Sequence, residues 1–434
     1  MNQRLGTWIG VGLILVLLIG SAGGGPAQAQ PSSAGQKMVL RWFFWSGTEE
    51  ERKFWEDLAA AASRALPNIE VKFETDAFPN FWPKLETLAA AGQVPCIVGL
   101  QSLRTATFVS RGVYVPLDDF TKADRDVNLN DFNKGIIEGL SYRGKLYALP
   151  YDFGPIILYY NKTLFQKAGV PFPKEDWTWD DFLKTAKAMT REIDGKPVHG
   201  FAALNMINRV VPWIWSNGGD YGNADMTKSA LGKSETVEAI QWYADLLNKH
   251  KVAPPISEPG NAQWDREQFY AGRAAMYTDG PWNFVNVRSK LKDDWDITLL
   301  PRGRAGSATW VAGSGFGVSA NCKQRQEAYQ VIRFITNTES LSKLAKAGRG
   351  YPARASALPA FYRKDVPPGH QELVQKQAAT GRPFKVNADW QQTENFLNRD
   401  VLDVVLFTNK PAADVIKAAE ERYQALLTKS AQPK

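Results

Sequence analysis

The chain has 434 residues, a formal net charge of +7 and 44% hydrophobic residues. This length exceeds the size at which a single hydrophobic core stops growing, so two or three domains are expected. Lys and Arg are interleaved with Asp and Glu, as in residues 290–294, which favours a solvated surface of mixed charge over a nucleic-acid-binding patch.

The first 29 residues have the pattern of a secretory signal. Arg4 precedes an apolar stretch from Trp8 to Ile19, and the segment ends in the small residues Ala27-Gln28-Ala29. The apolar stretch is shorter than the roughly 20 residues that a membrane-spanning helix needs. We therefore expect cleavage near Gln30 and export to the periplasm without a membrane span. The sequence has no Cys before Cys96, so we expect no lipid anchor.

Strands and helices alternate along the first part of the mature chain. Residues 39–45 form a continuous apolar run, typical of a strand buried on both faces. Thr48 and Glu51 have capping-box spacing before a helical pattern. Alternation over residues 69–73 predicts a second strand, and residues 85–91 look helical. This order predicts parallel crossover connections and an α/β fold.

The middle of the chain predicts a crossing between two lobes. Residues 146–160 read as two apolar strands that are interrupted by residues 151–155, and we interpret the interruption as a hinge. Thr178 and Asp181 then give a second helix-cap signal, and Ser234 begins another helical pattern.

The remaining elements are short strands, one long strand and helices. Short strands are predicted at residues 274–277 and 297–300, and a Gly-spaced strand is predicted at residues 310–319. Gly348 is placed to end a helix, and the last helix is predicted to begin at Pro411. The periodicity thus indicates α/β elements arranged in two lobes.

The sequence offers little support for catalysis or for metal binding. The three His residues are isolated from one another and from Cys, whereas metal sites need donors at close spacing. Ser314 lacks the Gly two positions before it that a nucleophile elbow requires. We therefore expect no metal, no cofactor and no enzymatic activity. A secreted glycoside hydrolase is a distant alternative.

Tryptophan is abundant, with 15 residues in the chain. Several Trp residues stand at the ends of apolar runs rather than inside helical stripes. In open α/β sheets ligands bind beyond the carboxyl ends of strands, where the flat face of Trp suits the CH face of a pyranose. Core packing is the alternative interpretation for each of them. The candidates for ligand contact are Trp45, Trp213, Trp215, Trp282, Trp310 and Trp390.

An ordered set of motifs resembles the family 1 extracellular solute-binding proteins, the periplasmic receptors of sugar-type ABC importers. The motifs are Leu149-Pro150-Tyr151, Leu158 to Lys162, Trp179 to Phe182, Asn217-Gly218-Gly219, Phe269 to Met276, Asp279 to Trp282 and Gly350-Tyr351-Pro352. The resemblance implies a two-lobed α/β fold of the type II periplasmic binding protein class, with ligand in the cleft between the lobes.

The resemblance also implies how the lobes divide the chain. The first lobe would contain residues 36–150 and 305–349, and the second would contain residues 155–302 and 353–430. The three crossings are expected near residues 151–154, 303–304 and 350–352.

The resemblance implies a set of ligand contacts in addition to the tryptophans. The matching positions are Asp76, Gln101, Arg104, Tyr151, Asp152, Asp279, Gly313 and Tyr351. The expected ligand is a disaccharide or short oligosaccharide, and the expected partners are the permease subunits of an ABC importer. We expect the receptor to be a monomer. A glycerol phosphate ester is the alternative ligand, with Arg104 or Arg354 facing the phosphate.

The resemblance places the two cysteines near each other. By the family topology, Cys96 opens a parallel strand and Cys322 follows a strand that runs the opposite way beside it, so both sulfur atoms would lie away from the ligand. A disulfide and two buried free thiols are both open at this stage, in a compartment that favours the disulfide.

Overall fold

The computed structural model describes residues 37–257 and 260–432. The predicted signal segment, residues 1–29, lies outside the described residues. Among the described residues, none of the helices combines the length and the apolar character that crossing a membrane requires.

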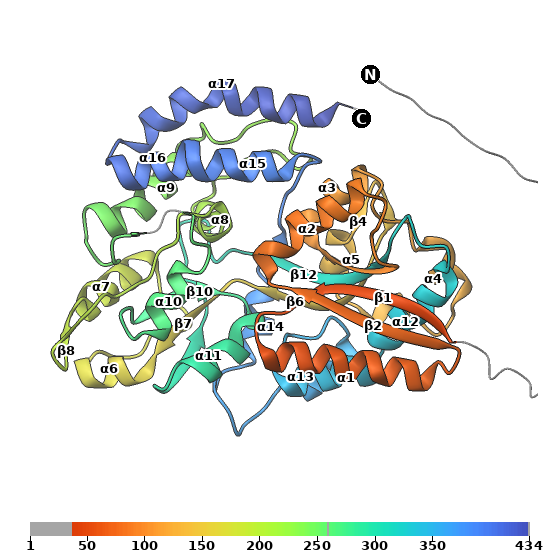
Figure 1. The fold of residues 1–434 in the computed structure, drawn as a ribbon. Helices are drawn as coiled ribbons and strands as arrows, with labels where there is room; N and C mark the ends of the chain where they lie inside the picture. Colours follow the sequence, from red (N-terminus) through yellow and green to blue (C-terminus); the bar gives the residue numbers. More distant parts are fainter. Residues whose placement is uncertain (1–36, 258–259, 433–434) are drawn as a thin grey trace, which may run out of the picture. The chain divides into compact units, whose positions relative to one another are not determined.

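The first sheet has six strands in the order β13-β12-β3-β1-β2, with β6 also paired to β12. Figure 1 labels β1, β2, β6 and β12 of this sheet. Its strands are β1 (Met38–Trp45), β2 (Ile69–Asp76), β3 (Ile97–Gln101), β6 (Leu149–Pro155), β12 (Thr309–Val318) and β13 (Gly381–Pro383). β1 is parallel to both β2 and β3, which confirms the predicted parallel crossovers. β12 is antiparallel to β3 and β6, so this one strand joins chain segments that are far apart in sequence.

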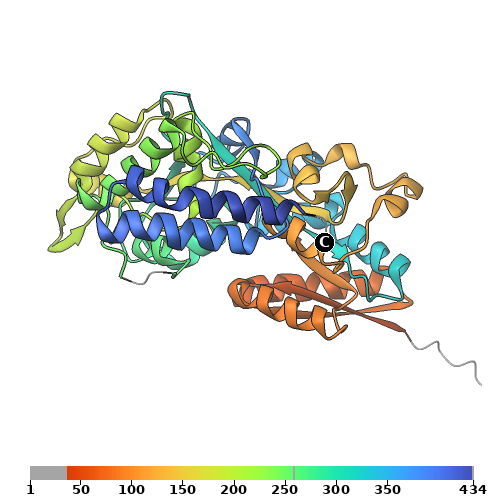
Figure 2. The same cartoon turned by 90° about the horizontal axis from the view of Figure 1, so that it is seen from above.

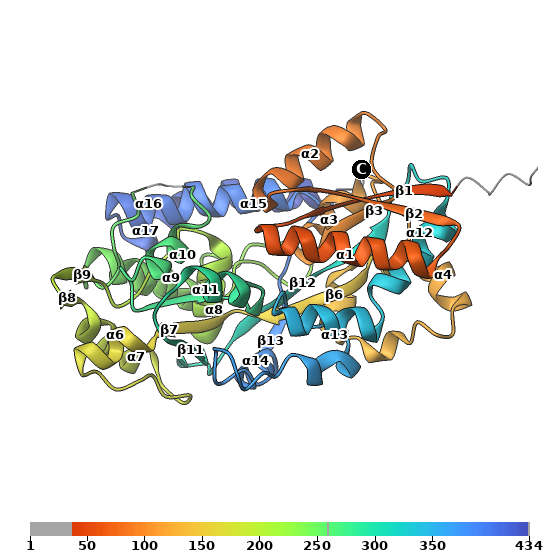
Figure 3. The same cartoon turned by 60° about the horizontal axis from the view of Figure 1, so that its bottom comes forward.

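Helices pack on the first sheet through apolar side chains. Trp55 of α1 is fully buried against Trp42 of β1, with ring centroids 5.7 Å apart, and α1 lies along β1 and β2 (Figure 3). The helices of this part are α1 (Glu49–Ala65), α2 (Phe78–Ala90), η1 (Ser102–Arg104), α3 (Thr105–Ser110), α4 (Asp118–Ala123), η2 (Leu129–Asp131), α5 (Lys134–Gly139), α12 (Arg325–Ile335), α13 (Thr338–Ala347), η4 (Ala355–Ala360) and α14 (Leu373–Ala378).

The second sheet has three antiparallel strands in the order β10-β7-β11. They are β7 (Ile157–Asn161), β10 (Met276–Asp279) and β11 (Trp295–Thr298), and two hairpins are formed by β4 (Ser141–Tyr142) with β5 (Lys145–Leu146) and by β8 (Arg191–Ile193) with β9 (Lys196–Val198). The helices that follow these strands are α6 (Lys162–Ala168), α7 (Trp179–Met189), α8 (Ile207–Ser216), α9 (Ser234–Asn248), α10 (Trp264–Tyr270), η3 (Pro281–Asn283) and α11 (Phe284–Lys290).

The C-terminal helices continue the helical part that surrounds α8 and α9. They are α15 (Trp390–Phe396), the π-helical η5 (Leu397–Leu402), α16 (Asp403–Thr408) and α17 (Ala412–Ala431). α15 and α17 run side by side (Figure 2), and α9 contacts both α16 and α17. Apolar residues from α7, α8, α9, α15 and α17 share one buried cluster.

Local signals correctly predicted two helix starts and one helix end. Thr48 accepts a hydrogen bond from the backbone N–H of Glu51 at the start of α1. Thr178 and Asp181 form a complete capping box at the start of α7. Gly348 follows α13 with φ of 72°, the left-handed conformation that favours glycine. These predictions are confirmed.

Two local predictions are wrong. The predicted interruption at residues 151–155 is part of β6, because Gly154 and Pro155 pair with Ala312 and Val311 of β12. The chain therefore leaves the first sheet after Pro155 and enters the second at Ile157. Trp213 and Trp215 do not end an apolar run: both lie inside α8, a helix that is buried on nearly all sides.

The segment after the third expected crossing packs mainly with the first sheet's helices. η4 contacts α13, and Arg354 donates to the carbonyl oxygens of Thr336 and Val127. The expected second-lobe segment of residues 353–430 thus begins with residues that are held by helices of the first part.

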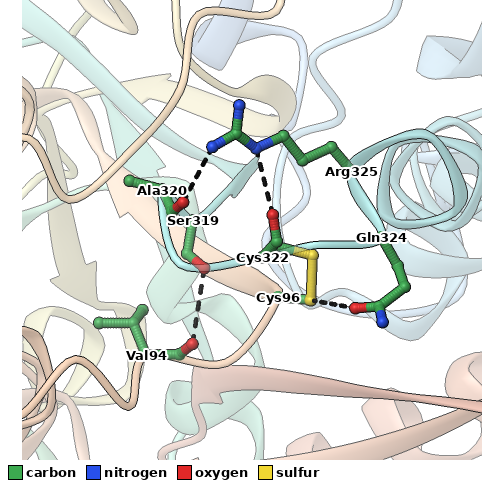
Figure 4. Close-up of a disulfide and its surroundings, with 7 residues drawn as sticks. All are labelled: Val94, Cys96, Ser319, Ala320, Cys322, Gln324 and Arg325. Carbon is green, nitrogen blue, oxygen red and sulfur yellow. Dashed lines mark hydrogen bonds between the residues drawn. A yellow bond between two sulfur atoms is a disulfide. The ribbon is translucent and has the colours of Figure 1, made fainter.

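Cys96 and Cys322 form a disulfide, so the choice that the sequence left open is settled in favour of the bond (Figure 4). Cys96 directly precedes β3 and Cys322 follows β12. The disulfide therefore crosslinks the ends of two antiparallel neighbours, on the side away from the carboxyl end of β3 at Gln101. Nearby, Arg325 donates to the carbonyl oxygens of Cys322 and Ala320.

Candidate functional site

Asp279, the last residue of β10, is the centre of a buried ionic network. Arg266 donates to both of its carboxylate oxygens, and Arg209 approaches Oδ1 at 3.3 Å. Arg209 also donates to Asp265 at 3.0 Å. Burial opposes the ionisation of Asp279, but the two guanidinium groups outweigh it and hold the pKa of Asp279 below its ordinary value. The network thus balances two positive charges against two negative ones.

Asp279 fixes the position of Trp282. The indole Nε1 of Trp282 donates to Asp279 Oδ1 at 3.0 Å, and the backbone N–H of Gly280 donates to the same oxygen at 2.9 Å. A Cβ atom at Gly280 would lie 2.1 Å from the Trp282 ring, so this turn requires glycine. The ring itself is partly exposed. One edge of Trp282 is therefore anchored, and part of its surface faces outward.

Trp282 belongs to a continuous set of aromatic side chains. Its ring stacks on Trp310 of β12 with centroids 6.0 Å apart and planes inclined by 21°. Trp310 Nε1 donates to the carbonyl oxygen of Asn208 at 2.6 Å. Ring contacts then continue from Trp310 through a further four residues. We name the whole set the aromatic wall: Trp215, Tyr221, Trp282, Trp310, Phe384 and Trp390.

The members of the aromatic wall differ in how exposed their side chains are. Trp282 is partly exposed, whereas the other members are buried. Trp390 is completely buried, and its Nε1 has no hydrogen-bond partner in the described structure. Trp282 is therefore the member whose ring is most directly available to a ligand in this conformation.

Arg104 connects the first sheet to α15, the helix that begins with Trp390. It lies in η1, which directly follows β3. Its Nη1 donates to Gln391 at 2.7 Å, and its Nη2 pairs with Glu394 at 3.0 Å. Its guanidinium also lies 5.9 Å from the centroid of the Trp82 ring. The side chain that was expected to meet a ligand is thus paired with protein groups here.

Asp152 belongs to a second buried ionic group, at the pairing of β6 with β12. Its Oδ1 accepts a hydrogen bond from the backbone N–H of Ser314 at 2.9 Å. Burial raises the pKa of Asp152 to about 7, while nearby Arg349 acts in the opposite direction. Arg349 forms an ion pair with Glu51 at 3.2 Å and also lies near the hydroxyl of Tyr151.

This group reaches the loop that follows β1. Glu51 accepts a hydrogen bond from the backbone N–H of Gly47 at 2.6 Å while it pairs with Arg349. Gly313 lies on the other side of Asp152, where a Cβ atom would lie 2.2 Å from the Asp152 carbonyl oxygen. Gly313 thus allows β6 and β12 to pack closely. The ionic group connects the expected hinge at residues 151–154 to the loop that follows β1.

The carboxyl ends of β1, β2 and β3 carry three further predicted residues. Trp45 and Asp76 are register partners at the ends of β1 and β2, and Gln101 ends β3. Trp45 is largely buried against aromatic neighbours that include Trp82. Asp76 accepts a hydrogen bond from Lys84 at 3.0 Å, which lowers the pKa of Asp76. The sheet therefore brings these three residues to one edge.

Three predicted residues lie in packed surroundings instead. Trp213 is buried among the aromatic rings of α7 and α9. Tyr351 is buried, and its hydroxyl bonds to that of Tyr362. Arg354 is buried, and all three of its guanidinium nitrogen atoms donate to protein oxygens, among them Asp131 Oδ2. A phosphate role for Arg354 therefore has no support in this arrangement.

Sequence reasoning missed several residues that surround the aromatic wall. Glu394 is four residues after Trp390, so helical spacing from Trp390 was the one signal from which it could have been found. Arg266 and Arg209 carry no recognisable motif. Arg382 lies with its guanidinium carbon 3.9 Å from the centroid of the Trp215 ring, and its exposed position gave no signal in the sequence.

A surface hollow of about 700 Å³ lies elsewhere, between the end of α1, α4 and α12. Of the predicted ligand residues it contains Arg354 alone. Its Asp124 already accepts hydrogen bonds from Tyr329 and Arg333. The chemistry of the aromatic wall and its ionic anchors is therefore separate from this hollow.

The comparisons with known proteins point to one family. The family described as bacterial extracellular solute-binding proteins matches residues 57–368. The arabinooligosaccharide-binding protein of Bacillus subtilis is 25% identical over 418 residues, which cover 90% of this chain and 92% of that protein.

Two solved structures have the same fold. One is an ABC substrate-binding protein from Listeria monocytogenes in complex with cycloalternan, with a TM-score of 0.83, 25% identity, and coverage of 90% of this chain and 99% of the other. The other is the maltose-bound MalE3 of T. maritima, with a TM-score of 0.77, 22% identity, and coverage of 90% of this chain and 100% of the other.

Proposed function

Because the chain belongs to the bacterial extracellular solute-binding proteins, we propose that it is the substrate-binding component of an ABC importer for a disaccharide or short oligosaccharide. The arabinooligosaccharide-binding and cycloalternan-bound relatives support this ligand class. The observation that carries the proposal is the stacked pair of Trp282 and Trp310, which is anchored by Asp279 and Asn208.

The chemistry of the aromatic wall suits a carbohydrate. The face of an indole ring packs well against the apolar CH face of a pyranose, and nearby polar groups then accept or donate to its hydroxyls. Trp282 is anchored through its own N–H, so its ring loses little conformational entropy when a sugar binds. We assign the stacking contact to Trp282 and Trp310, and the hydroxyl contacts to Asp76, Gln101 and Arg104.

The proposed mechanism is closure of two lobes over the ligand. The lobes follow the two sheets. The chain crosses between β6 and β7 after Pro155, between β11 and β12 at residues 299–308, and after β13 at residues 384–389. To move such an equilibrium from mostly open to mostly closed, the ligand has to favour the closed form by about 5.5 kcal/mol. Arg104 with Glu394 is a direct contact between the two parts in this structure, and it contributes to the closed form before any ligand contact is counted.

The family assignment also suggests where the protein acts and what it contacts. The family is extracellular, and we propose a periplasmic monomer that is exported by a cleaved signal, carries no lipid anchor and delivers its ligand to the permease. The protein binds its ligand without converting it. In the described residues, no group of three or more His, Cys, Asp or Glu side chains is arranged to hold a metal ion.

Isothermal titration calorimetry on the mature chain tests the proposal. Arabino-, malto- and galacto-oligosaccharides form the test panel, and glycerol phosphodiesters represent the alternative ligand class. We expect saturable heat with at least one oligosaccharide and a matching rise in melting temperature. Binding of a phosphodiester and of no saccharide would transfer the proposal to the alternative, and a panel without any binding would overturn both.

A further inference from the structure

Arg382 stands at the aromatic wall with its hydrogen-bonding capacity unused. It lies in β13, where its Cα is the register partner of Trp310 in the parallel pair of β12 with β13. Register partners in a parallel pair direct their side chains to the same face of the sheet. In addition, the Arg382 guanidinium lies over Trp215, with its central carbon 3.9 Å from the ring centroid. Arg382 is therefore placed between two members of the aromatic wall.

Three cations near the aromatic wall are each paired with a carboxylate. Arg104 pairs with Glu394 at 3.0 Å, and Lys385 pairs with Asp220 at 2.5 Å. Asp279 pairs with Arg266. Among the described residues, Arg382 has an exposed side chain and forms neither a hydrogen bond nor an ion pair. In this part of the chain, the Arg382 charge therefore has no carboxylate partner.

The stacking on Trp215 gives this charge a defined position. A guanidinium on an aromatic face keeps its N–H donors free at its edge, and its planar fork matches the two oxygens of a carboxylate or phosphate. Trp215 is itself fixed, because its Nε1 donates to Asp220 at 3.0 Å. The Trp215 ring thus holds one face of the guanidinium, and the N–H groups at its edge are available to an anionic partner.

We propose that Arg382 makes the site selective for a saccharide that carries an anionic group, either the carboxylate of a uronic acid or a phosphate. The inference rests on the proposed function, because it assigns the chemical class of the ligand that the same wall receives. The sugar ring stacks on Trp282 and Trp310, and its acidic substituent receives two charge-assisted hydrogen bonds from Arg382.

Calorimetry with matched ligands tests the inference. The probes are an oligogalacturonate, the neutral galacto-oligosaccharide of the same length, and a phosphorylated form of that neutral sugar. We expect one of the two acidic forms to bind at least about tenfold more tightly than the neutral sugar, with an affinity that falls as salt is raised. Whether the carboxylate or the phosphate form shows the gain identifies the source of the charge.

Substitutions isolate the guanidinium. Arg382→Gln should remove the preference for the acidic form while neutral-sugar affinity stays within about twofold, and Arg382→Lys should retain part of the preference because it keeps charge but not the planar fork. Arg422→Gln is the matched control, because Arg422 of α17 is an exposed guanidinium that lies near the ring of Phe396 in α15. It should leave the preference unchanged.

The two proposals fail in different ways. Equal or tighter binding of the neutral sugar by the wild-type protein would overturn the anion preference and leave the proposed function intact. An acidic preference that survives Arg382→Gln would overturn the assignment to Arg382. No binding of any neutral or acidic saccharide would overturn the proposed function itself.

Discussion

At the scale of single residues, the site depends on how polar groups hold aromatic rings. Asp279 accepts from both Trp282 Nε1 and Gly280 N–H, while two arginines neutralise its charge. A buried carboxylate without such partners would be strongly destabilising. Here the carboxylate instead acts as the fixed point from which the Trp282 ring extends. We therefore treat Asp279 as a positioning residue and Trp282 as the contact residue.

The first prediction concerns Trp282. Trp282→Ala should weaken saccharide binding by roughly 2 kcal/mol or more, because aromatic anchors in interfaces lose about that amount on truncation. This corresponds to a rise of about 30-fold in Kd. Titration calorimetry with the best oligosaccharide measures it.

Phe172→Ala is the control for Trp282→Ala, because Phe172 is an exposed aromatic residue outside the aromatic wall. Its Kd should match that of the wild type. If Trp282→Ala bound as tightly as the control, the stacking assignment would be wrong.

The second prediction concerns the pH dependence set by Asp152. Burial raises the pKa of Asp152 from its ordinary 3.8 to about 7, so the folded chain holds this proton more tightly than the unfolded chain does. Its contribution to stability is complete below pH 4 and is lost as the pH rises through 7. The total change is on the order of 4 kcal/mol.

Asp152→Asn cannot titrate, and its amide oxygen still accepts from the backbone N–H of Ser314. The free energy of unfolding of this variant, relative to wild type, should therefore rise between pH 4.5 and 8. Urea denaturation at several pH values gives the difference. A difference that stays constant with pH would show that Asp152 does not titrate in this range.

At the scale of elements, β12 is the strand that assembles the site. It pairs with β3, β6 and β13, and thereby places Trp310, Gly313 and Ser314 beside residues from distant parts of the chain. The disulfide fastens the end of β12 to the start of β3. Because Cys96 and Gln101 stand at opposite ends of β3, this fastening is separate from the ligand-facing edge.

The third prediction follows from that separation. The double variant Cys96→Ser, Cys322→Ser should lower the free energy of unfolding by about 2–5 kcal/mol, since the bond restricts the unfolded chain. The Kd for the saccharide should change less than about twofold, because no site residue moves. Thermal melting and calorimetry measure the two quantities. A large loss of affinity with unchanged stability would contradict the structural role.

The elements also show which features the sequence predicts well. The starts of α1 and α7 were predictable because Thr48 and Thr178 bond to backbone three residues ahead, which is a local interaction. The continuity of β6 through Gly154 and Pro155 was not, because pairing with β12 far along the chain decides it.

The prediction of the site was limited in the same way, because the sequence does not reveal which distant residues pair with each other. Trp282 was identified from its local motif, whereas the pairing of Arg104 with Glu394 joins residues that are 290 positions apart in the sequence. Trp213 and Trp215 were placed at the end of an apolar run because α8 is buried on nearly all sides and has no polar stripe to reveal its period.

At the scale of the whole molecule, the proposed closure requires that the two lobes move relative to each other. The chain passes from one to the other between β6 and β7, between β11 and β12, and between β13 and α15. Such crossings permit rotation of the two parts while each part keeps its own buried core. Binding energy from the aromatic wall is then available to favour the closed form.

Small-angle X-ray scattering of the mature chain, with and without a saturating oligosaccharide, measures whether the two lobes close over the ligand. Closure predicts a smaller radius of gyration on binding, and a much smaller decrease for Trp282→Ala at the same ligand concentration when that concentration is below the variant's Kd. A radius of gyration that stays the same while calorimetry shows full occupancy would contradict closure over the ligand.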